Sequence, residues 1–181
     1  MMRFVAIFLS SLFMCSSVFA GSVTSLSLGE LASALNDRMQ VMRKVAGYKA
    51  QHHLPVEDLP REQVVMTSML KNAQDAGLDP QSVEPFVHAL MNTGKAIQYR
   101  WLADWLATPD TGAPVTDLTD SRQQIQQFDK RLMTAVSQRL MAGAFTEADM
   151  AWLAGQIKAP NLSKADKNTL LVSLSQIKRA T

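Results

Sequence analysis

A stripe of apolar residues in the first third of the chain is interrupted by two cations. The stripe comprises Leu31, Leu35, Arg38, Met42, Val45 and Lys49. Its alternating steps of four and three residues are the spacing of one buried helix face. A lone cation in a protein core is unfavourable unless an anionic group neutralises it. Two cations on one buried face therefore predict an internal site for an anion.

The first twenty residues have the pattern of a cleavable secretory signal peptide. Arg3 precedes an apolar run from Phe4 to Cys15, and the small residues that follow are typical of cleavage after Ala20. The run is shorter than the about 20 apolar residues that a membrane-spanning helix needs. Bulky Met14 stands where a small residue would precede a lipid-modified cysteine. We therefore expect an exported protein, periplasmic or secreted, with no membrane attachment after cleavage.

Cleavage would leave residues 21–181 as a single domain with one core. The only cysteine would leave with the signal peptide, so no disulfide is expected and stability must come from packing. The formal net charge of the whole chain is only +2, and no long basic run occurs. These features argue against nucleic acid as a partner.

Helix start and stop signals recur through this domain, whereas the alternating β-branched pattern of strands is almost absent. We expect helices over about 28–52, 58–77, 80–106 and 118–143, and two shorter ones that open at Thr146 and near Ser163. Asp58 and Asp79 are expected N-caps, the second followed by Pro80 at the first helical position. The sequence predicts an all-α fold of about six helices. Core helices would cover 28–106, a linker 107–117 and C-terminal helices 118–181.

Three further polar residues are in phase with apolar stripes. Arg61 shares its stripe with Val65, and Arg122 follows Leu118 by four residues. Gln98 lies three residues before a tryptophan on the inward face of its helix. Together with Arg38 and Lys49, four cations and one amide thus point toward the core of one small domain.

Each of these residues also has a purely structural interpretation. A single inward arginine can be ion-paired within the protein or can extend its charged end to solvent. Lys49 lies near the end of its helix, where a cation favours the helix dipole. Asp58 and Glu62 are explained as a cap and a first-turn acid. Because these two acids are fewer than the four cations, the surplus favours an anionic ligand.

A metal site or a phosphate-binding loop has little support in the sequence. His52 and His53 are adjacent and point in different directions on a helix, and His88 is remote from both. The chain has no glycine-rich phosphate loop. We therefore expect no metal and no other cofactor.

The charged positions are similar to those of the helical chorismate mutases. The matching stretches are Asp37-Arg38-Met39, Val45-Ala46-Gly47-Tyr48-Lys49, Leu54-Pro55-Val56-Glu57-Asp58-Leu59-Pro60-Arg61-Glu62 and Lys95-Ala96-Ile97-Gln98, with a shorter match at Ser121-Arg122. The signal peptide and the additional helical region resemble the exported, periplasmic subclass. The likeness extends from about residue 28 to residue 105 and is faint beyond residue 143.

This resemblance implies an isomerase that converts the dianion chorismate to prephenate by a concerted rearrangement. In shorter, intracellular members of the family a dimer partner donates one arginine to each site. In the exported subclass the extra helices replace that partner, and Arg122 would be the arginine concerned. The site would then be complete in each chain, and the family leaves a homodimer plausible.

The resemblance also implies a role for each charged group. Arg38 and Arg122 would hold the two carboxylates of the substrate. Lys49 would contact a carboxylate and the ether oxygen, and Gln98 would donate to the same oxygen from the other side. The expected catalytic residues are therefore Lys49 and Gln98.

Three other residues would orient the ring hydroxyl of the substrate, and one position departs from the family pattern. Asp58, Arg61 and Glu62 are expected around the hydroxyl. Gly94 stands where the family usually has a small hydroxyl residue, so one possible carboxylate donor is missing.

Two rival interpretations remain open at the level of sequence. The same cationic pocket could belong to a catalytically silent binding protein for an aromatic dianion. Such a protein would have no use for two donors on an ether oxygen. Alternatively, the methionines could line an exposed groove of a helical periplasmic adaptor or chaperone, which would leave the inward arginines unexplained.

Overall fold

The computed structural model describes residues 17–109 and 117–181, with side chains from residue 25 onward. This part of the chain forms helices and no strand beyond one isolated bridge between Leu78 and Arg179. The helices are α1 (Ser17–Gln51), α2 (Leu59–Asp75), α3 (Pro80–Ala107), α4 (Thr119–Leu140), α5 (Glu147–Gln156) and α6 (Lys164–Ser175). The predicted all-α fold is confirmed.

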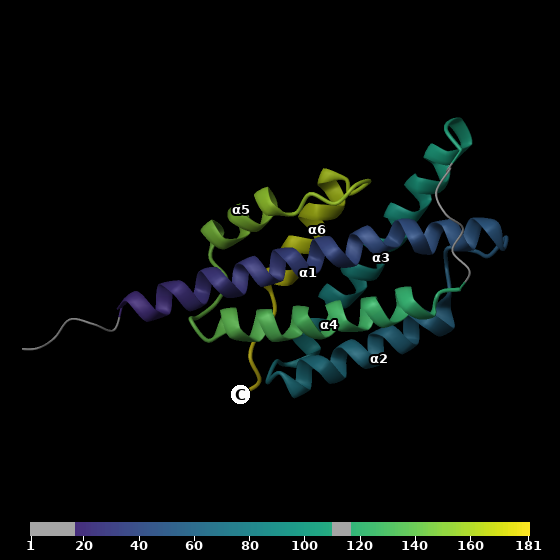
Figure 1. The fold of residues 1–181 in the computed structure, drawn as a ribbon. Coiled ribbons are helices and arrows are strands. Elements are labelled where there is room, and N and C mark those ends of the chain that lie inside the picture. Colours follow the sequence, from purple (N-terminus) through teal and green to yellow (C-terminus); the bar gives the residue numbers. More distant parts are fainter. Residues whose placement is uncertain (1–16, 110–116) are drawn as a thin grey trace, which may run out of the picture.

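Helix α1 is the long axis of the molecule, and α4 runs beside it in the opposite direction (Figure 1). These two helices share the most extensive packing in the described structure. Helix α2 packs on α3 and α4, whereas α3 also packs on α1 and α6. Helix α5 contacts α1 and α6. Helices α1 to α4 therefore form the bundle, and α5 and α6 cover one side of it.

The core consists of the apolar stripes that the sequence predicts. Leu31 and Leu35 of α1 are fully buried, as are Leu132 and Val136 of α4. Several methionines, among them Met69, are equally inaccessible. These methionines fill the interior of the bundle, which argues against the adaptor interpretation.

Local capping explains where most helices begin. The side chain of Asp58 accepts a hydrogen bond from the backbone N–H of Arg61 (3.1 Å), and Asp79 caps α3 in the same way. Thr146 and Asp149 form a reciprocal capping box at α5. The predicted N-caps are thus confirmed, and each cap satisfies backbone N–H groups that have no partner within the helix.

The first helix begins earlier than predicted. It starts at Ser17 instead of Leu28, because no proline or other stop signal interrupts the sequence ahead of the apolar stripe. Most of the expected signal peptide (1–16) and most of the expected linker (110–116) lie outside the described residues, so both stay predictions. In the described part of the chain, no helix has the length and apolarity needed to span a membrane.

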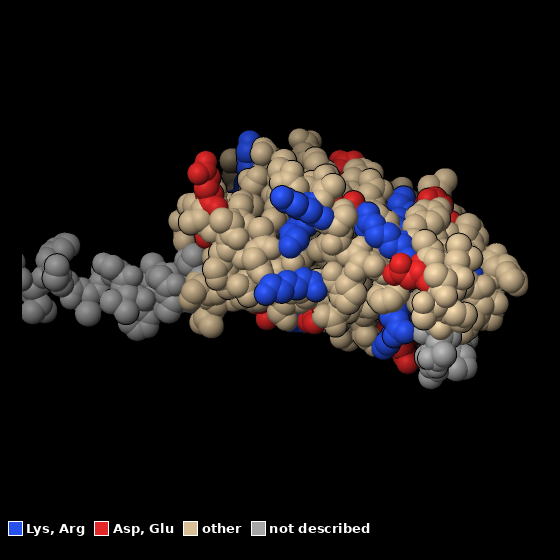
Figure 2. All heavy atoms as spheres, turned by 90° about the horizontal axis from the view of Figure 1, so that it is seen from above, with Lys and Arg blue, Asp and Glu red and all other residues tan. Residues whose placement is uncertain are grey.

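Charged side chains of both signs appear on the upper face of the molecule (Figure 2). On the face shown in Figure 2, Lys and Arg lie among uncharged residues, and some have acidic neighbours. Arg131 of α4, for example, pairs with Glu30 (2.6 Å) and Asp37 (3.1 Å) of α1. Exposed pairs of this kind contribute little to stability.

A buried ion pair fastens the loop after α4. Arg139, near the end of α4, pairs with Asp149 of α5, and its guanidinium also donates to the backbone carbonyls of Gly143 (3.0 Å) and Ala144 (3.3 Å). The side chains are only 4% and 10% exposed. Breaking such a pair leaves an uncompensated charge in the interior, which is strongly destabilising.

We predict that Asp149→Ala lowers the free energy of unfolding by about 3–5 kcal/mol, because Arg139 would keep its charge without a carboxylate partner. Urea denaturation followed by circular dichroism measures this loss. The variant should remain folded without denaturant. A loss below about 1 kcal/mol, the size expected for a helix cap alone, would contradict the role of the pair.

Candidate active site

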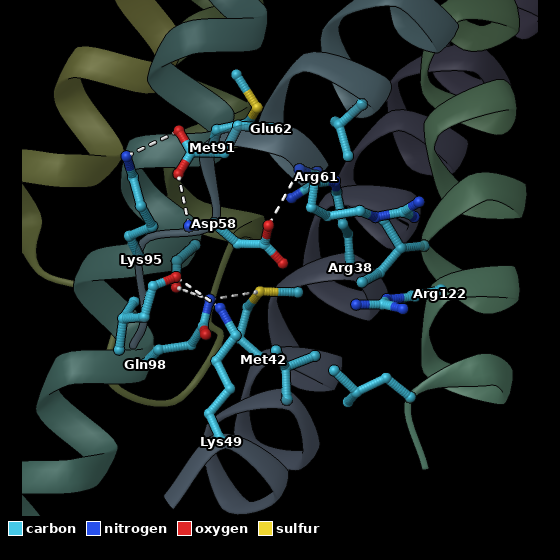
Figure 3. Close-up of a pocket in the computed structure, with 16 residues that line it drawn as sticks. Arg38, Met42, Lys49, Asp58, Arg61, Glu62, Met91, Lys95, Gln98 and Arg122 are labelled. Carbon is cyan, nitrogen blue, oxygen red and sulfur yellow. Dashed lines mark hydrogen bonds and ion pairs between the residues drawn. The ribbon is translucent and has the colours of Figure 1, made fainter. Parts of the chain in front are cut away.

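One pocket lies among α1, α2, α3 and α4, and all seven residues expected from the sequence line it (Figure 3). They are Arg38 and Lys49 of α1, Asp58, Arg61 and Glu62 at the start of α2, Gln98 of α3, and Arg122 of α4. Apolar side chains from the same helices complete the walls, including Met42, Val45, Met91 and Ile125. The helix stripes thus bring these polar groups together in an otherwise apolar cleft.

Arg38 is held by a carboxylate behind the pocket. Its Nε donates to Oδ1 of Asp129 on α4 at 2.6 Å, and both side chains are about 5% exposed or less. Asp129 is not itself a lining residue. The guanidinium of Arg38 is therefore fixed at one edge and reaches the pocket with the other.

Lys49 is buried at the end of α1. Its Nζ donates to the backbone carbonyl of Val56 at 2.5 Å. Burial lowers the pKa of Lys49 from its ordinary value of 10.5, and neighbouring Arg122 lowers it further, while Asp58 and Glu62 act in the opposite direction. The structural explanation of Lys49 by the helix dipole alone is incomplete, because the ammonium turns inward to the pocket.

The start of α2 supplies two acids and one further cation. Asp58 caps the helix, and Glu62 accepts from the backbone N–H of Asp58 (3.4 Å) and pairs with Lys95 of α3 (3.0 Å). Burial lowers the pKa of Arg61, as does the charge of nearby Arg122. Asp58 and Glu62 are thus anchored, while Arg61 turns its side chain toward the other arginines.

Gln98 is buried in the α3 wall with half of its amide unpaired. Its Nε2 donates to the backbone carbonyl of Gly94 (3.2 Å) and lies 3.6 Å from the sulfur of Met42. Within the described residues, no group donates to its Oε1. A Cβ at Gly94 would lie 3.2 Å from the Met42 sulfur and 3.8 Å from Nη1 of Arg38. The absence of a side chain at this position therefore lets Met42 of α1 pack closely against α3.

Arg122 enters the pocket from the first turns of α4 and, unlike Arg38, is exposed. It lies at the mouth of the site, on the helix that carries Asp129. In Figure 3, the three arginines occupy one side, whereas Gln98 lies across from them. The arrangement therefore offers cations at the mouth and at the base, and side-chain N–H donors on the opposite wall.

The charges of the site leave a surplus of two. Five lining residues are cationic: Arg38, Lys49, Arg61, Lys95 and Arg122. Two lining residues, Asp58 and Glu62, are acidic, and Asp129 is a third acid because it pairs with Arg38. With ordinary charges the net value is +2, which is complementary to a dianion.

Two charged groups were absent from the expected site. Asp129 lies four residues after Ile125 and three before Leu132, so it is in phase with the buried stripe of α4. The spacing argument that identified Arg38 could have found it. Lys95 precedes Gln98 by three residues and could have been assigned to the same face. The expectation that only two acids were available to the cations was therefore wrong.

The described residues contain no group of three or more His, Cys, Asp or Glu side chains placed to hold a metal ion. His52 stacks against Tyr48, with ring centroids 4.2 Å apart, and His88 lies beside Glu84 on the surface of α3.

The chain is similar to proteins named as chorismate mutases over nearly its whole length. The model of the family "Chorismate mutase type II" matches residues 29–99. A monofunctional chorismate mutase of Enterobacter agglomerans is 68% identical, with 99% of each chain covered. A secreted chorismate mutase of Yersinia pestis is 34% identical, covering 94% of this chain and 92% of that protein. The crystal structure of the secreted chorismate mutase from Yersinia pestis superimposes with a TM-score of 0.77 over 83% of this chain and 98% of that one. This protein belongs to the chorismate mutase type II family.

Proposed function

We propose that the protein rearranges chorismate to prephenate in the pocket between α1 and α4. The observation that carries this proposal is a partly enclosed site with a surplus of two positive charges, all of it supplied by one chain. Chorismate carries two carboxylates, and its rearrangement breaks a C–O bond and forms a C–C bond within one molecule. The reaction consumes no co-substrate and forms no covalent bond to the enzyme.

Such a rearrangement needs a folded substrate conformer. Arg38 and Arg122 lie on different helices, so they can hold the two carboxylates at separate points. A guanidinium offers two parallel N–H donors to a carboxylate, which fixes direction as well as distance. Holding the reacting carbon atoms close together can contribute up to about 7–11 kcal/mol in favourable reactions.

Negative charge develops on the ether oxygen as its bond to carbon breaks. Lys49 and Gln98 are the donors that can stabilise it. One well-placed donor contributes roughly 3–4 kcal/mol in comparable sites. One N–H of the Gln98 amide donates to the carbonyl of Gly94, and the other has only the weak contact to the Met42 sulfur, so this second N–H can turn to the substrate without losing a strong hydrogen bond.

The remaining polar groups would orient the ring hydroxyl. Glu62 is held by Lys95 and by the backbone N–H of Asp58, so its carboxylate has a defined position on the pocket wall. Asp58 and Arg61 border the same space. A hydroxyl can donate to either acid and accept from the guanidinium, which would select one face of the substrate ring.

The proposed location is the periplasm or the exterior of the cell. The expected signal peptide supports it, as do the names of two relatives, the secreted chorismate mutases of Yersinia pestis and Mycobacterium tuberculosis. Export also suits a site whose seven polar residues all belong to one chain. An enzyme diluted outside the cytoplasm then needs no partner chain to complete its pocket.

The activity test is the loss of chorismate absorbance with the purified protein, compared with Arg38→Ala. We expect turnover that is unaffected by a metal chelator, and a fall of kcat/KM by about 30-fold or more in the variant, since removing one partner of a buried charged pair costs roughly 2–5 kcal/mol or more. If the folded protein binds prephenate but shows no turnover, the interpretation as a catalytically silent binding protein is the one that remains. The absence of both turnover and prephenate binding would contradict the proposal.

The role of Gln98 predicts a pH dependence. An amide donates at any pH, so we expect a nearly flat kcat between pH 5 and 8. In Gln98→Glu only the protonated acid can donate to the ether oxygen, and activity should be confined to acidic conditions. Steady-state rates at pH 5 and pH 8 measure the difference. Equal activity of the variant at both values would exclude a donor role for residue 98.

The role of Lys49 predicts a loss of activity at alkaline pH. Because burial lowers the pKa of Lys49 below 10.5, the free enzyme should lose its ammonium, and with it kcat/KM, at a lower pH than an exposed lysine would. In Lys49→Arg the cation persists, so the alkaline decline of the residual activity should move to higher pH. If the activity of Lys49→Arg declines at the same alkaline pH as that of the parent protein, the decline is due to the titration of another group.

A further inference from the structure

The pair between Arg38 and Asp129 joins the pocket to the packing of α1 on α4. Arg38 lines the pocket, whereas Asp129 lies behind it, and their contact is 2.6 Å between Nε and Oδ1. Both side chains are almost completely shielded from solvent. Because Asp129 does not line the pocket, we expect its effect on a bound ligand to act through Arg38.

The contact determines which part of the guanidinium is available. Asp129 occupies Nε, while Nη1 reaches toward α3, since a Cβ at Gly94 would lie 3.8 Å from it. At least Nη1 therefore points from α1 toward the α3 wall of the pocket. A bidentate grip on a carboxylate needs this orientation, because the donors of a guanidinium lie in one plane.

The other acids of the pocket are competing partners for a mobile arginine. Asp58 and Glu62 both border the space that Arg38 reaches. Each already accepts hydrogen bonds, Asp58 from the backbone of Arg61 and Glu62 from Lys95. A guanidinium released by Asp129 could turn to either of them and leave the position at which a substrate carboxylate would bind.

We propose that Asp129 is a positioning residue that holds the Arg38 guanidinium by Nε and presents its terminal nitrogens to a substrate carboxylate. This inference rests on the proposed function, in which Arg38 binds that carboxylate. Asp129 also neutralises Arg38 when the pocket is empty, so the buried cation has a partner throughout the catalytic cycle.

Three variants separate positioning from charge and from folding. Asp129→Ala removes the hydrogen-bond acceptor, whereas Asp129→Asn keeps an oxygen at the same place and removes only the charge. Asp149→Ala is the matched control, because it breaks the buried pair with Arg139 outside the pocket. All proteins are expressed from the full sequence, and circular dichroism establishes the folded fraction before each measurement.

We expect Asp129→Ala to raise KM for chorismate at least 10-fold while kcat changes less than 3-fold, because a carboxylate grip serves bound substrate and transition state alike. Asp129→Asn should keep KM within about 3-fold of the parent protein, since its amide oxygen still accepts from Nε. The control should lose stability and keep KM. The dissociation constant of prephenate, measured by calorimetry, should follow KM in every protein.

A double variant tests whether Asp129 acts through Arg38. If it does, adding Asp129→Ala to Arg38→Ala should leave KM unchanged, because coupled residues are not additive. Independent effects in the double variant would overturn the inference. An unchanged KM in folded Asp129→Ala would also overturn it, because this result indicates a purely structural role. Tighter ligand binding in both Asp129 variants would overturn it as well, because this result indicates that Asp129 simply repels the ligand by its charge.

The failure of this inference can be told from failure of the proposed function. Suppose that the parent protein turns over chorismate, that Arg38→Ala loses this activity, and that Asp129→Ala keeps it with the parental KM. This result overturns the positioning role alone. If the parent protein shows no turnover and no prephenate binding, both the proposed function and the positioning role are overturned. Binding without turnover overturns the catalytic proposal, and the dissociation constants then decide the role of Asp129.

Discussion

The structure depends on keeping positive charge inside a helical bundle. Arg38 and Lys49 lie on the face of α1 that packs into the core, and both are more than 90% buried. Each is supported by an oxygen from another part of the chain, the carboxylate of Asp129 and the carbonyl of Val56. These contacts compensate the loss of water without filling the pocket. The cations therefore remain available to a ligand, at an energetic cost that a purely structural core would avoid.

The surplus charge explains why one small cleft can serve both binding and catalysis. A dianion that enters meets two positive charges more than negative ones, in surroundings where apolar side chains such as Val45 and Ile125 limit solvent. Electrostatic interactions are stronger where water is excluded. The same field that attracts the substrate also favours charge that develops on its ether oxygen. No nucleophile is needed for such a reaction, so the site can consist of fixed donors.

Helical periodicity and capping were sufficient for the helices and for five polar residues of the site, whereas Asp58 and Glu62 were assigned to it only through the family resemblance. Asp58 at the start of α2 and Thr146 at the start of α5 are local signals, and the structure confirms them. Pairings across the bundle are not local. The contact of Arg38 with Asp129 joins residues 91 positions apart, and nothing in either stripe specifies the partner. The early start of α1 was missed for a different reason, since an apolar stripe marks burial and not the helix end.

The packing of α4 on α1 makes the fold and the site mutually dependent. Helix α4 brings Arg122 to the mouth of the pocket and Asp129 to its base, seven residues apart and thus on the same helix face. The register of α4 along α1 therefore sets two features of the site at once. A shift by one turn would move both groups by about 5.4 Å, further than a side chain could correct without losing the buried pair. Because Asp129 pairs only in the correct register, the ion pair that orients Arg38 also favours the helix alignment that delivers Arg122.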